Sequence, residues 1–162
     1  MSKVLVIYCS LSGNTKAAAE AIAEGARSAG AEVVVKNGRD AQPADLLNSD
    51  AVALGSYDAF SYMGGGLKDF FDRTYYPVLE RVNGRPYAVL VCAGSDGSNA
   101  ARQIQRIATG WRLSAVAEPI VVCSHAQTPE AIQRSKTLPD EALARCAELG
   151  AAFAAGLALG VF

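Results

Sequence analysis

A buried-strand pattern that passes directly into an amphipathic helix constrains this chain more than any other feature. Residues 3–8 form a continuous apolar run rich in β-branched residues, typical of a strand covered by helices on both faces. The period then changes, and the apolar residues that share one face of the predicted helix are Ala19, Ile22, Ala23 and Ala26. Gly30 is placed to end this helix. A strand followed by a helix in this way predicts an α/β protein.

Further apolar runs alternate with helical patterns along the rest of the chain. We expect four more strands, at residues 32–36, 50–56, 87–92 and 119–123. We expect helices at residues 67–74, 98–110 and 140–159, with at most a short helical connection at 43–48. Five short strands that alternate with helices predict a doubly wound parallel sheet with right-handed crossovers. The sequence shows no linker, so we expect residues 1–162 to form one domain.

The turn between the first strand and the first helix has the chemistry of an anion site. Its residues are Ser10, Leu11, Ser12, Gly13, Asn14 and Thr15. A helix N-terminus offers unpaired backbone N–H groups and partial positive charge, so it binds phosphate without a basic side chain. We expect Gly13 to let the backbone come close and Asn14 to take a positive φ. An ordinary helix cap uses the same residue types, and the turn taken alone supports both interpretations equally.

The composition and the absence of certain sequence motifs argue against several other functions. The chain has neither G-x-x-x-x-G-K-[ST] nor G-x-G-x-x-G, which argues against a nucleoside triphosphate site and a Rossmann dinucleotide site. A net charge of −1 without a basic run argues against nucleic acid. The N-terminal apolar run is too short for a signal peptide and the uncharged stretch at 149–162 too short for a membrane span, so we expect a cytoplasmic protein without membrane insertion. The four cysteines lack metal or disulfide spacing: Cys9, Cys92, Cys123 and Cys146. The first three are interpreted as small buried hydrophobes.

Three loops are predicted to meet at one edge of the sheet, because ligands of such sheets bind beyond the carboxyl ends of the strands. The first is the turn at 10–15. The second contributes Ser56, Tyr57, Asp58, Ala59, Phe60 and Tyr62. The third contributes Cys92, Ala93, Gly94, Ser95, Asp96 and Gly97. Together, a phosphate-binding turn, an aromatic loop and a small polar loop predict a pocket for a flat heteroaromatic phosphate monoester. An aromatic side chain of the protein would cover the plane of the ligand ring.

These motifs resemble those of the flavodoxin-like family of FMN-binding proteins over nearly the whole chain. The family's phosphate pattern is met by Ser10, Ser12, Gly13 and Thr15, and residues 65–73 are similar to the group that includes NAD(P)H-dependent flavin and quinone reductases. The resemblance implies the strand order 2-1-3-4-5, with the FMN phosphate at 10–15 and the isoalloxazine ring between 56–62 and 94–97. The chain departs from many relatives at Tyr57 and Asp58, where these carry Pro and Thr.

Two redox functions follow from the resemblance. One is an enzyme that accepts hydride from NADH or NADPH and passes electrons to a quinone, a free flavin or another small acceptor. The other is a one-electron carrier between redox proteins; a flavin-free binding or regulatory module is a third interpretation. Near-neutral charge and the lack of an aromatic residue in the loop at 92–99 favour the enzyme. No catalytic residue can be assigned from the sequence. We interpret His125 as a loop histidine, and a homodimer is compatible with the sequence.

Overall fold

The computed structural model describes residues 1–134 and 137–162. Its strands are β1 (Lys3–Tyr8), β2 (Glu32–Asn37), β3 (Ala51–Ala59), β4 (Tyr62–Met63), β5 (Pro86–Ala93), β6 (Ser114–Ala115) and β7 (Ile120–Cys123). Its helices are α1 (Asn14–Ser28), α2 (Pro43–Leu47), α3 (Gly65–Val78), α4 (Ser98–Gly110), α5 (Pro129–Gln133) and α6 (Asp140–Leu159). Strand and helix therefore alternate along most of the chain, as the apolar runs predict.

The predicted strand order is confirmed for the five longer strands. All of them run parallel, with β1 between β2 and β3, β5 beside β3, and β7 beside β5. Counted along the chain, this is the order 2-1-3-4-5. The two-residue strand β6 also pairs in parallel with β5, beside Pro86 and Tyr87, so β6 and β7 form one interrupted edge strand. The short strand β4 pairs antiparallel with the far end of β3 and adds a hairpin outside the parallel sheet.

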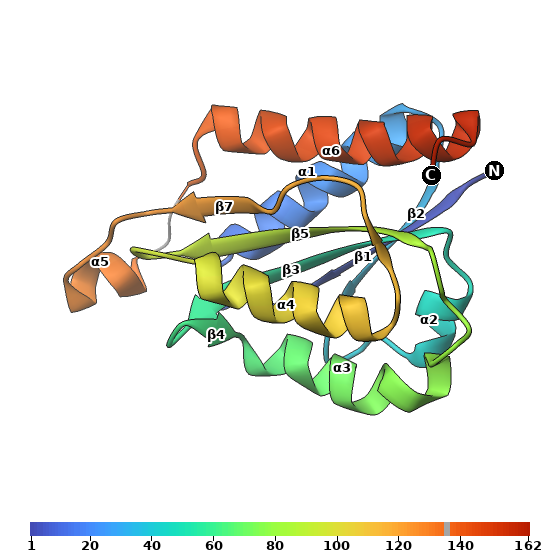
Figure 1. The fold of residues 1–162 in the computed structure, drawn as a ribbon. Coiled ribbons are helices and arrows are strands. Elements are labelled where there is room, and N and C mark those ends of the chain that lie inside the picture. Colours follow the sequence, from blue (N-terminus) through green and yellow to red (C-terminus); the bar gives the residue numbers. More distant parts are fainter. Residues whose placement is uncertain (135–136) are drawn as a thin grey trace.

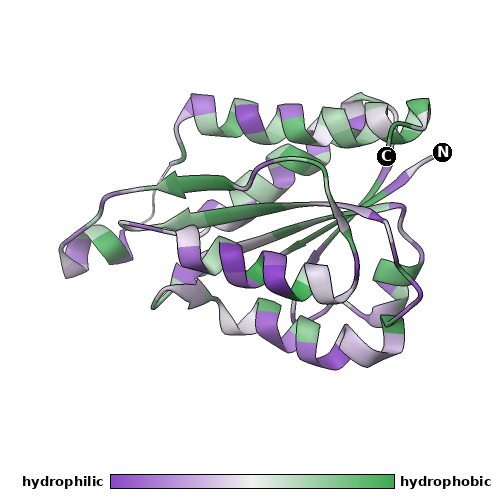
Figure 2. Ribbon diagram, in the orientation of Figure 1, coloured by the Kyte–Doolittle hydropathy of each residue, from purple (hydrophilic) through white to green (hydrophobic). Residues whose placement is uncertain are grey.

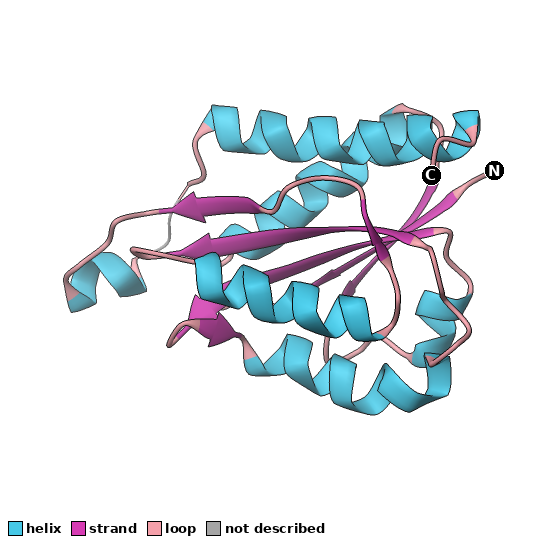
Figure 3. Ribbon diagram, viewed as in Figure 1, coloured by secondary structure: helices cyan, strands magenta, loops and turns pink. Residues whose placement is uncertain are grey.

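Helices cover both faces of the sheet (Figures 1 and 3). Helices α1 and α6 lie on one face, and α2, α3 and α4 lie on the other (Figure 1). Each face encloses its own apolar cluster, one with Phe70, Phe71 and Trp111 at its centre and the other with Ile22 and Phe153. The strands are the most uniformly hydrophobic elements, whereas α1, α3 and α4 alternate in hydropathy around their axes (Figure 2).

Helices α1 and α6 approach each other so closely that glycine is required at the contact. A Cβ atom on Gly25 would collide with the backbone carbonyl of Ala147, and one on Gly150 would collide with the carbonyl of Ile22. Among the described residues, α6 alone is long and apolar enough to cross a membrane by length and composition. It packs along α1 and buries Cys146, Phe153 and their neighbours against it, so we interpret α6 as a core helix.

Two local predictions were wrong. The segment at 57–66 was expected to be a loop, but β3 continues to Ala59 and turns back at Phe60 and Ser61, which both have positive φ. The turn is held by Asp58, whose Oδ1 accepts from the Ser61 N–H at 3.0 Å, and by Asn99, whose Nδ2 donates to the Ser61 carbonyl at 2.5 Å. Asn14 is the first helical residue of α1, and Gly13 takes the positive φ, at 97°.

Candidate functional site

The turn between β1 and α1 leaves the helix N-terminus free of side-chain caps. Gly13 occupies the N-cap position, and no side chain accepts a hydrogen bond from the first turn of α1. The Ser10 hydroxyl instead accepts from the Gly13 N–H at 3.1 Å. The ordinary helix-cap interpretation is therefore wrong. The first N–H groups of α1 remain as donors, and together with the partial positive charge of the helix they suit a phosphate.

A pocket opens beside this turn, at the carboxyl ends of the parallel strands. It joins all three predicted loops to the segment after β7, and its lining residues are Leu11, Ser12, Asn14, Thr15, Tyr57, Asp58, Cys92, Ala93, Gly94, Ser124, Ala126 and Ile132. A second hollow of about 290 Å³ shares Asn14, Ala93 and Ser124 with it.

Half of the predicted site residues lie outside the pocket lining. Ser56 is fully buried, and its hydroxyl is used internally: it donates to the Tyr57 carbonyl and accepts from the Gly64 N–H, both at 2.8 Å. Phe60 is fully exposed at the hairpin tip, and Tyr62 packs against the core on the α3 side. The other predicted residues absent from the lining are Ser10, Gly13, Ala59, Ser95, Asp96 and Gly97.

The sequence analysis missed the contribution of the segment after β7. Ser124, Ala126 and Ile132 line the pocket because β7 ends at the same edge of the sheet as β1, β3 and β5. The position of the fifth strand was the signal that should have included this loop. His125 lies in it, exposed and outside the lining, with its backbone N–H donating to the Gly94 carbonyl at 2.7 Å. The loop-histidine interpretation therefore agrees with its position.

Tyr57 is the one aromatic residue among the described residues that line the pocket. The Tyr57 ring packs against Gly64. A Cβ atom on Gly64 would lie 2.7 Å from Cε1 of this ring, so the position of the ring requires glycine there. Burial raises the pKa of the Tyr57 phenol, and the hydrogen-bonded Cys9 thiol raises this pKa further. The phenol is therefore neutral at physiological pH and offers a fixed aromatic wall rather than a charge.

Two residues of the pocket lining each carry a buried acceptor without a partner. Asn14 Oδ1 and Asp58 Oδ2 are both buried, and neither receives a hydrogen bond. A buried polar atom that lacks a partner is costly unless a ligand satisfies it. FMN fits both properties of the pocket, because its phosphate suits the N–H groups of α1 and its ribityl hydroxyls and ring N–H are donors for the two acceptors.

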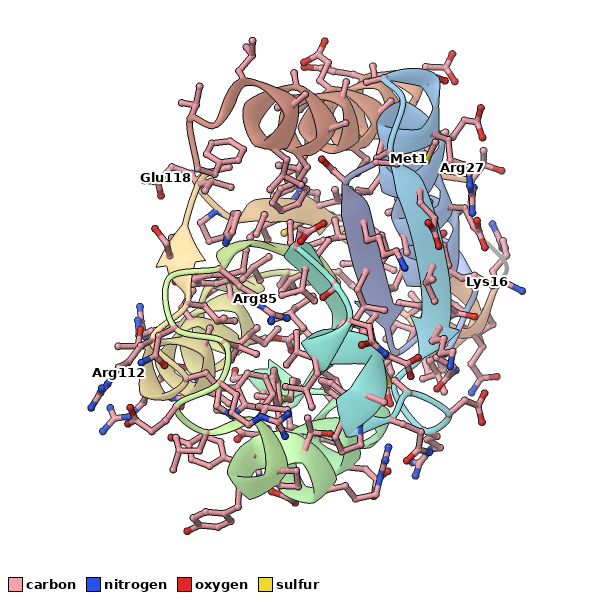
Figure 4. All side chains as sticks on the ribbon, turned by 90° about the vertical axis from the view of Figure 1, so that its right-hand side faces the viewer. Met1, Lys16, Arg27, Arg85, Arg112 and Glu118 are labelled. Atoms are coloured by element: carbon pink, nitrogen blue, oxygen red, sulfur yellow. The ribbon has the colours of Figure 1, made fainter. Side chains whose placement is uncertain are left out.

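A larger hollow, of about 490 Å³, lies at the opposite end of the sheet and is very open. It is lined by Asp50 and Arg85 among others, near Met1. Figure 4 faces this end, with Arg85 among the strand ends and Lys16 and Arg112 projecting outward on opposite sides. Arg85 is already engaged, since its Nη1 donates to the Leu46 carbonyl. Ligands of parallel sheets bind at the carboxyl ends, so the pocket beside α1 is the better candidate.

The buried-hydrophobe interpretation is confirmed for Cys9 and Cys92 and is wrong for Cys123. Cys9, Cys92 and Cys146 are buried, and Cys123 is partly exposed. Burial raises the pKa of Cys92, although a hydrogen bond with Thr15 acts in the opposite direction. Burial also raises the pKa of Cys146, to about 11. Because the thiolate is the reactive form, the buried thiols should be inert in the folded protein.

Thiol labelling should follow this order of burial. At pH 8, a thiol with a pKa of about 11 is ionised in roughly one molecule per thousand. We expect iodoacetamide to modify Cys123 first and Cys146 last, as followed by mass spectrometry of peptides after short pulses. The four cysteines should react at similar rates in denaturant. Equal rates for Cys123 and Cys146 in the folded protein would show that α6 opens readily.

Comparison with known proteins supports the same ligand. The flavodoxin family model matches residues 6–134. A flavodoxin from Aquifex aeolicus is 40% identical over 96 residues, which are 59% of this chain and 50% of that protein. An NAD(P)H dehydrogenase (quinone) from Archaeoglobus fulgidus is 33% identical over 106 residues, which are 50% of this chain and 56% of that protein. The chain thus spans about half the length of these curated relatives.

Solved structures show the same fold. A flavodoxin from the domain Archaea has a TM-score of 0.78 and 26% identity, and the match covers 96% of this chain and 99% of that protein. The family match includes the turn at 10–15 and the ends of β3, β5 and β7, which together form the pocket. The chain therefore belongs to the flavodoxin family of FMN-binding redox proteins.

Proposed function

We propose that this protein is an NAD(P)H-dependent oxidoreductase that holds FMN in the pocket beside α1 and passes electrons to a quinone, a free flavin or another small acceptor. The observation that carries this proposal is the single aromatic residue, Tyr57, among the described lining residues. The loop that follows β5 supplies only Cys92, Ala93 and Gly94 to the lining. With small residues on that side, a nicotinamide ring has room to stack on the flavin, which hydride transfer requires.

Each part of the pocket has a separate task in this proposal. The first N–H groups of α1 and the hydroxyls of Ser12 and Thr15 bind the phosphate. Tyr57 forms one wall for the ring, and Gly94 offers backbone groups to its polar edge. FMN, when bound, supplies the exchange of hydride with a nicotinamide and of electrons with an acceptor. The protein supplies position and access, and no side chain of this chain is assigned a proton transfer.

A one-electron carrier is the second candidate. It is favoured by the 40% identity with the Aquifex aeolicus flavodoxin and by the 26% identity with the archaeal flavodoxin over nearly its full length. Against it, the chain carries a net charge of only −1, whereas an acidic surface helps carriers to dock on basic partners. In both candidate functions the flavin occupies the same pocket, so only the source of electrons separates them.

Anaerobic mixing with a nicotinamide separates the two functions. We expect the flavin absorbance of the FMN-loaded protein to bleach within seconds of mixing with NADH or NADPH in a stopped-flow spectrometer. A small quinone added afterwards should restore the absorbance. Dithionite serves as the control that the bound flavin can be reduced. If neither nucleotide bleaches the flavin but a reductase protein does, the carrier function stands and the enzyme does not.

A further inference from the structure

Among the described residues that line the pocket, Asp58 has the one charged side chain, and the proposed function gives it no task. Its Oδ1 accepts from the Ser61 N–H at 3.0 Å, which fixes the orientation of the side chain within the β3–β4 turn. Its Oδ2 is buried and receives no hydrogen bond. Leaving a buried carboxylate oxygen without a donor is costly, and more so for a charged group than for a neutral one. A hydrogen-bond donor at this oxygen would therefore stabilise the site.

The register of the sheet places Asp58 beside the phosphate turn. Tyr8 pairs with Gly55 across β1 and β3, and the Cys9 N–H donates to the Gly55 carbonyl at 3.0 Å. Three residues further along β3, Asp58 therefore reaches the level of the turn that follows β1, and both segments line one pocket. Neighbouring strands lie about 5 Å apart, so a ligand anchored at this turn passes close to the Asp58 side chain.

Within residues 1–134 and 137–162, no group donates a hydrogen bond to this oxygen. The described residues that line the pocket include no lysine, arginine or histidine. Asp58 also takes part in none of the ion pairs between described residues. A ligand bound in the pocket can supply this donor. A dianionic phosphate is a poor partner, because it offers no proton and repels a carboxylate. A hydroxyl next to the phosphate is a good one, because an O–H donor to a charged acceptor forms a short, strong hydrogen bond.

We propose that Asp58 is a specificity-determining residue that accepts a hydrogen bond from a ribityl hydroxyl of the flavin. The proposal rests on the proposed function, since it takes FMN as the ligand of this pocket. Asp58 selects for the polyol chain of the ligand, while the N–H groups of α1 select for the phosphate. A planar ring without that chain would leave Asp58 Oδ2 buried and unpaired, as it is in the ligand-free chain.

The assignment can be tested with three flavins, each of which lacks one more part of FMN than the one before. The apoprotein is titrated at pH 8 with FMN, with riboflavin, which lacks the phosphate, and with lumiflavin, which lacks both phosphate and polyol chain. In Asp58→Asn the side chain keeps its shape and its acceptor for Ser61, but an amide NH₂ donor replaces Oδ2. We expect this variant to bind FMN and riboflavin about tenfold or more weakly, as for loss of a hydrogen bond to a charged group, and lumiflavin within about twofold of wild type.

Asp72→Asn is the matched control, because it removes the same charge from an exposed carboxylate on α3 that pairs with Lys68 at 2.6 Å. It should bind all three flavins as wild type does. The proposal is overturned if Asp58→Asn binds FMN more tightly and riboflavin unchanged, which would mean that Asp58 repels the phosphate. Equal losses for all three flavins, or no loss for any, would also overturn it. Failure of the enzyme proposal looks different: the wild type would bind flavins in this pattern, yet NADH and NADPH would not reduce it.

Discussion

Gly150→Ala should lower the free energy of unfolding by about 3 kcal/mol, at the upper end of typical overpacking costs. The added methyl group would collide with the Ile22 carbonyl and lie within 2.8 Å of the Ala26 nitrogen. Both are backbone atoms of α1, so no side chain can move aside, and the two helices must separate. That separation would loosen the cluster around Ile22 and Phe153 on this face of the sheet. Urea unfolding followed by circular dichroism measures the loss.

Gly156→Ala on the same helix is the matched control. Here the three atoms nearest to the new methyl group all belong to the ring of Phe162, which is 44% exposed and can rotate away. Alanine also favours a helix over glycine by about 1 kcal/mol, so the variant should be within about 1 kcal/mol of wild type. If the two variants were equally stable, α1 and α6 would not be in backbone contact.

The parallel sheet could be predicted because its central strands, β1, β3 and β5, are buried on both faces. In such a strand every residue is apolar, as in the run from Val4 to Ile7, which is at most 1% exposed. The small elements carry no such signal. Strands β4 and β6 have two residues each, and their pairing depends on neighbouring strands. The β3–β4 turn has positive φ at Phe60 and Ser61. Gly and Asn are the residues that usually indicate such a turn, and the sequence has neither at these positions.

The site was predictable in its location and less so in its residues. The carboxyl-end rule depends only on the direction of the strands, and the structure has a pocket at the edge that the rule predicts. The rule could not show that the Ser56 hydroxyl accepts a hydrogen bond from the Gly64 N–H, after β4, or that Phe60 is exposed to solvent. Helix α5 was missed although its start has a recognisable signature, with Thr128 as the N-cap and Pro129 following it. Including it would have brought Ile132 into the predicted site.

Gly13→Asp should weaken FMN binding by at least about 100-fold, the largest change in affinity that we expect from a single residue. Gly13 lies at the N-cap of α1 with φ at 97°, a conformation that costs other L residues energy. A Cβ atom there would meet nothing within 4 Å, so the effect comes from charge and backbone strain rather than from a clash. The new carboxylate would sit where the helix N-terminus receives the phosphate, and the two anions would repel each other.

Two comparisons separate charge from strain in this variant. Gly13→Asn has nearly the same shape and tolerates the left-handed conformation, but it is neutral, so it should bind FMN within about tenfold of wild type. Riboflavin, which has no phosphate, should bind Gly13→Asp and Gly13→Asn about equally. Titration of the apoprotein by quenching of flavin fluorescence gives all four affinities. If Gly13→Asp weakened riboflavin and FMN alike, the phosphate would not be held at the turn between β1 and α1, and the orientation of the flavin in the pocket would have to be reversed.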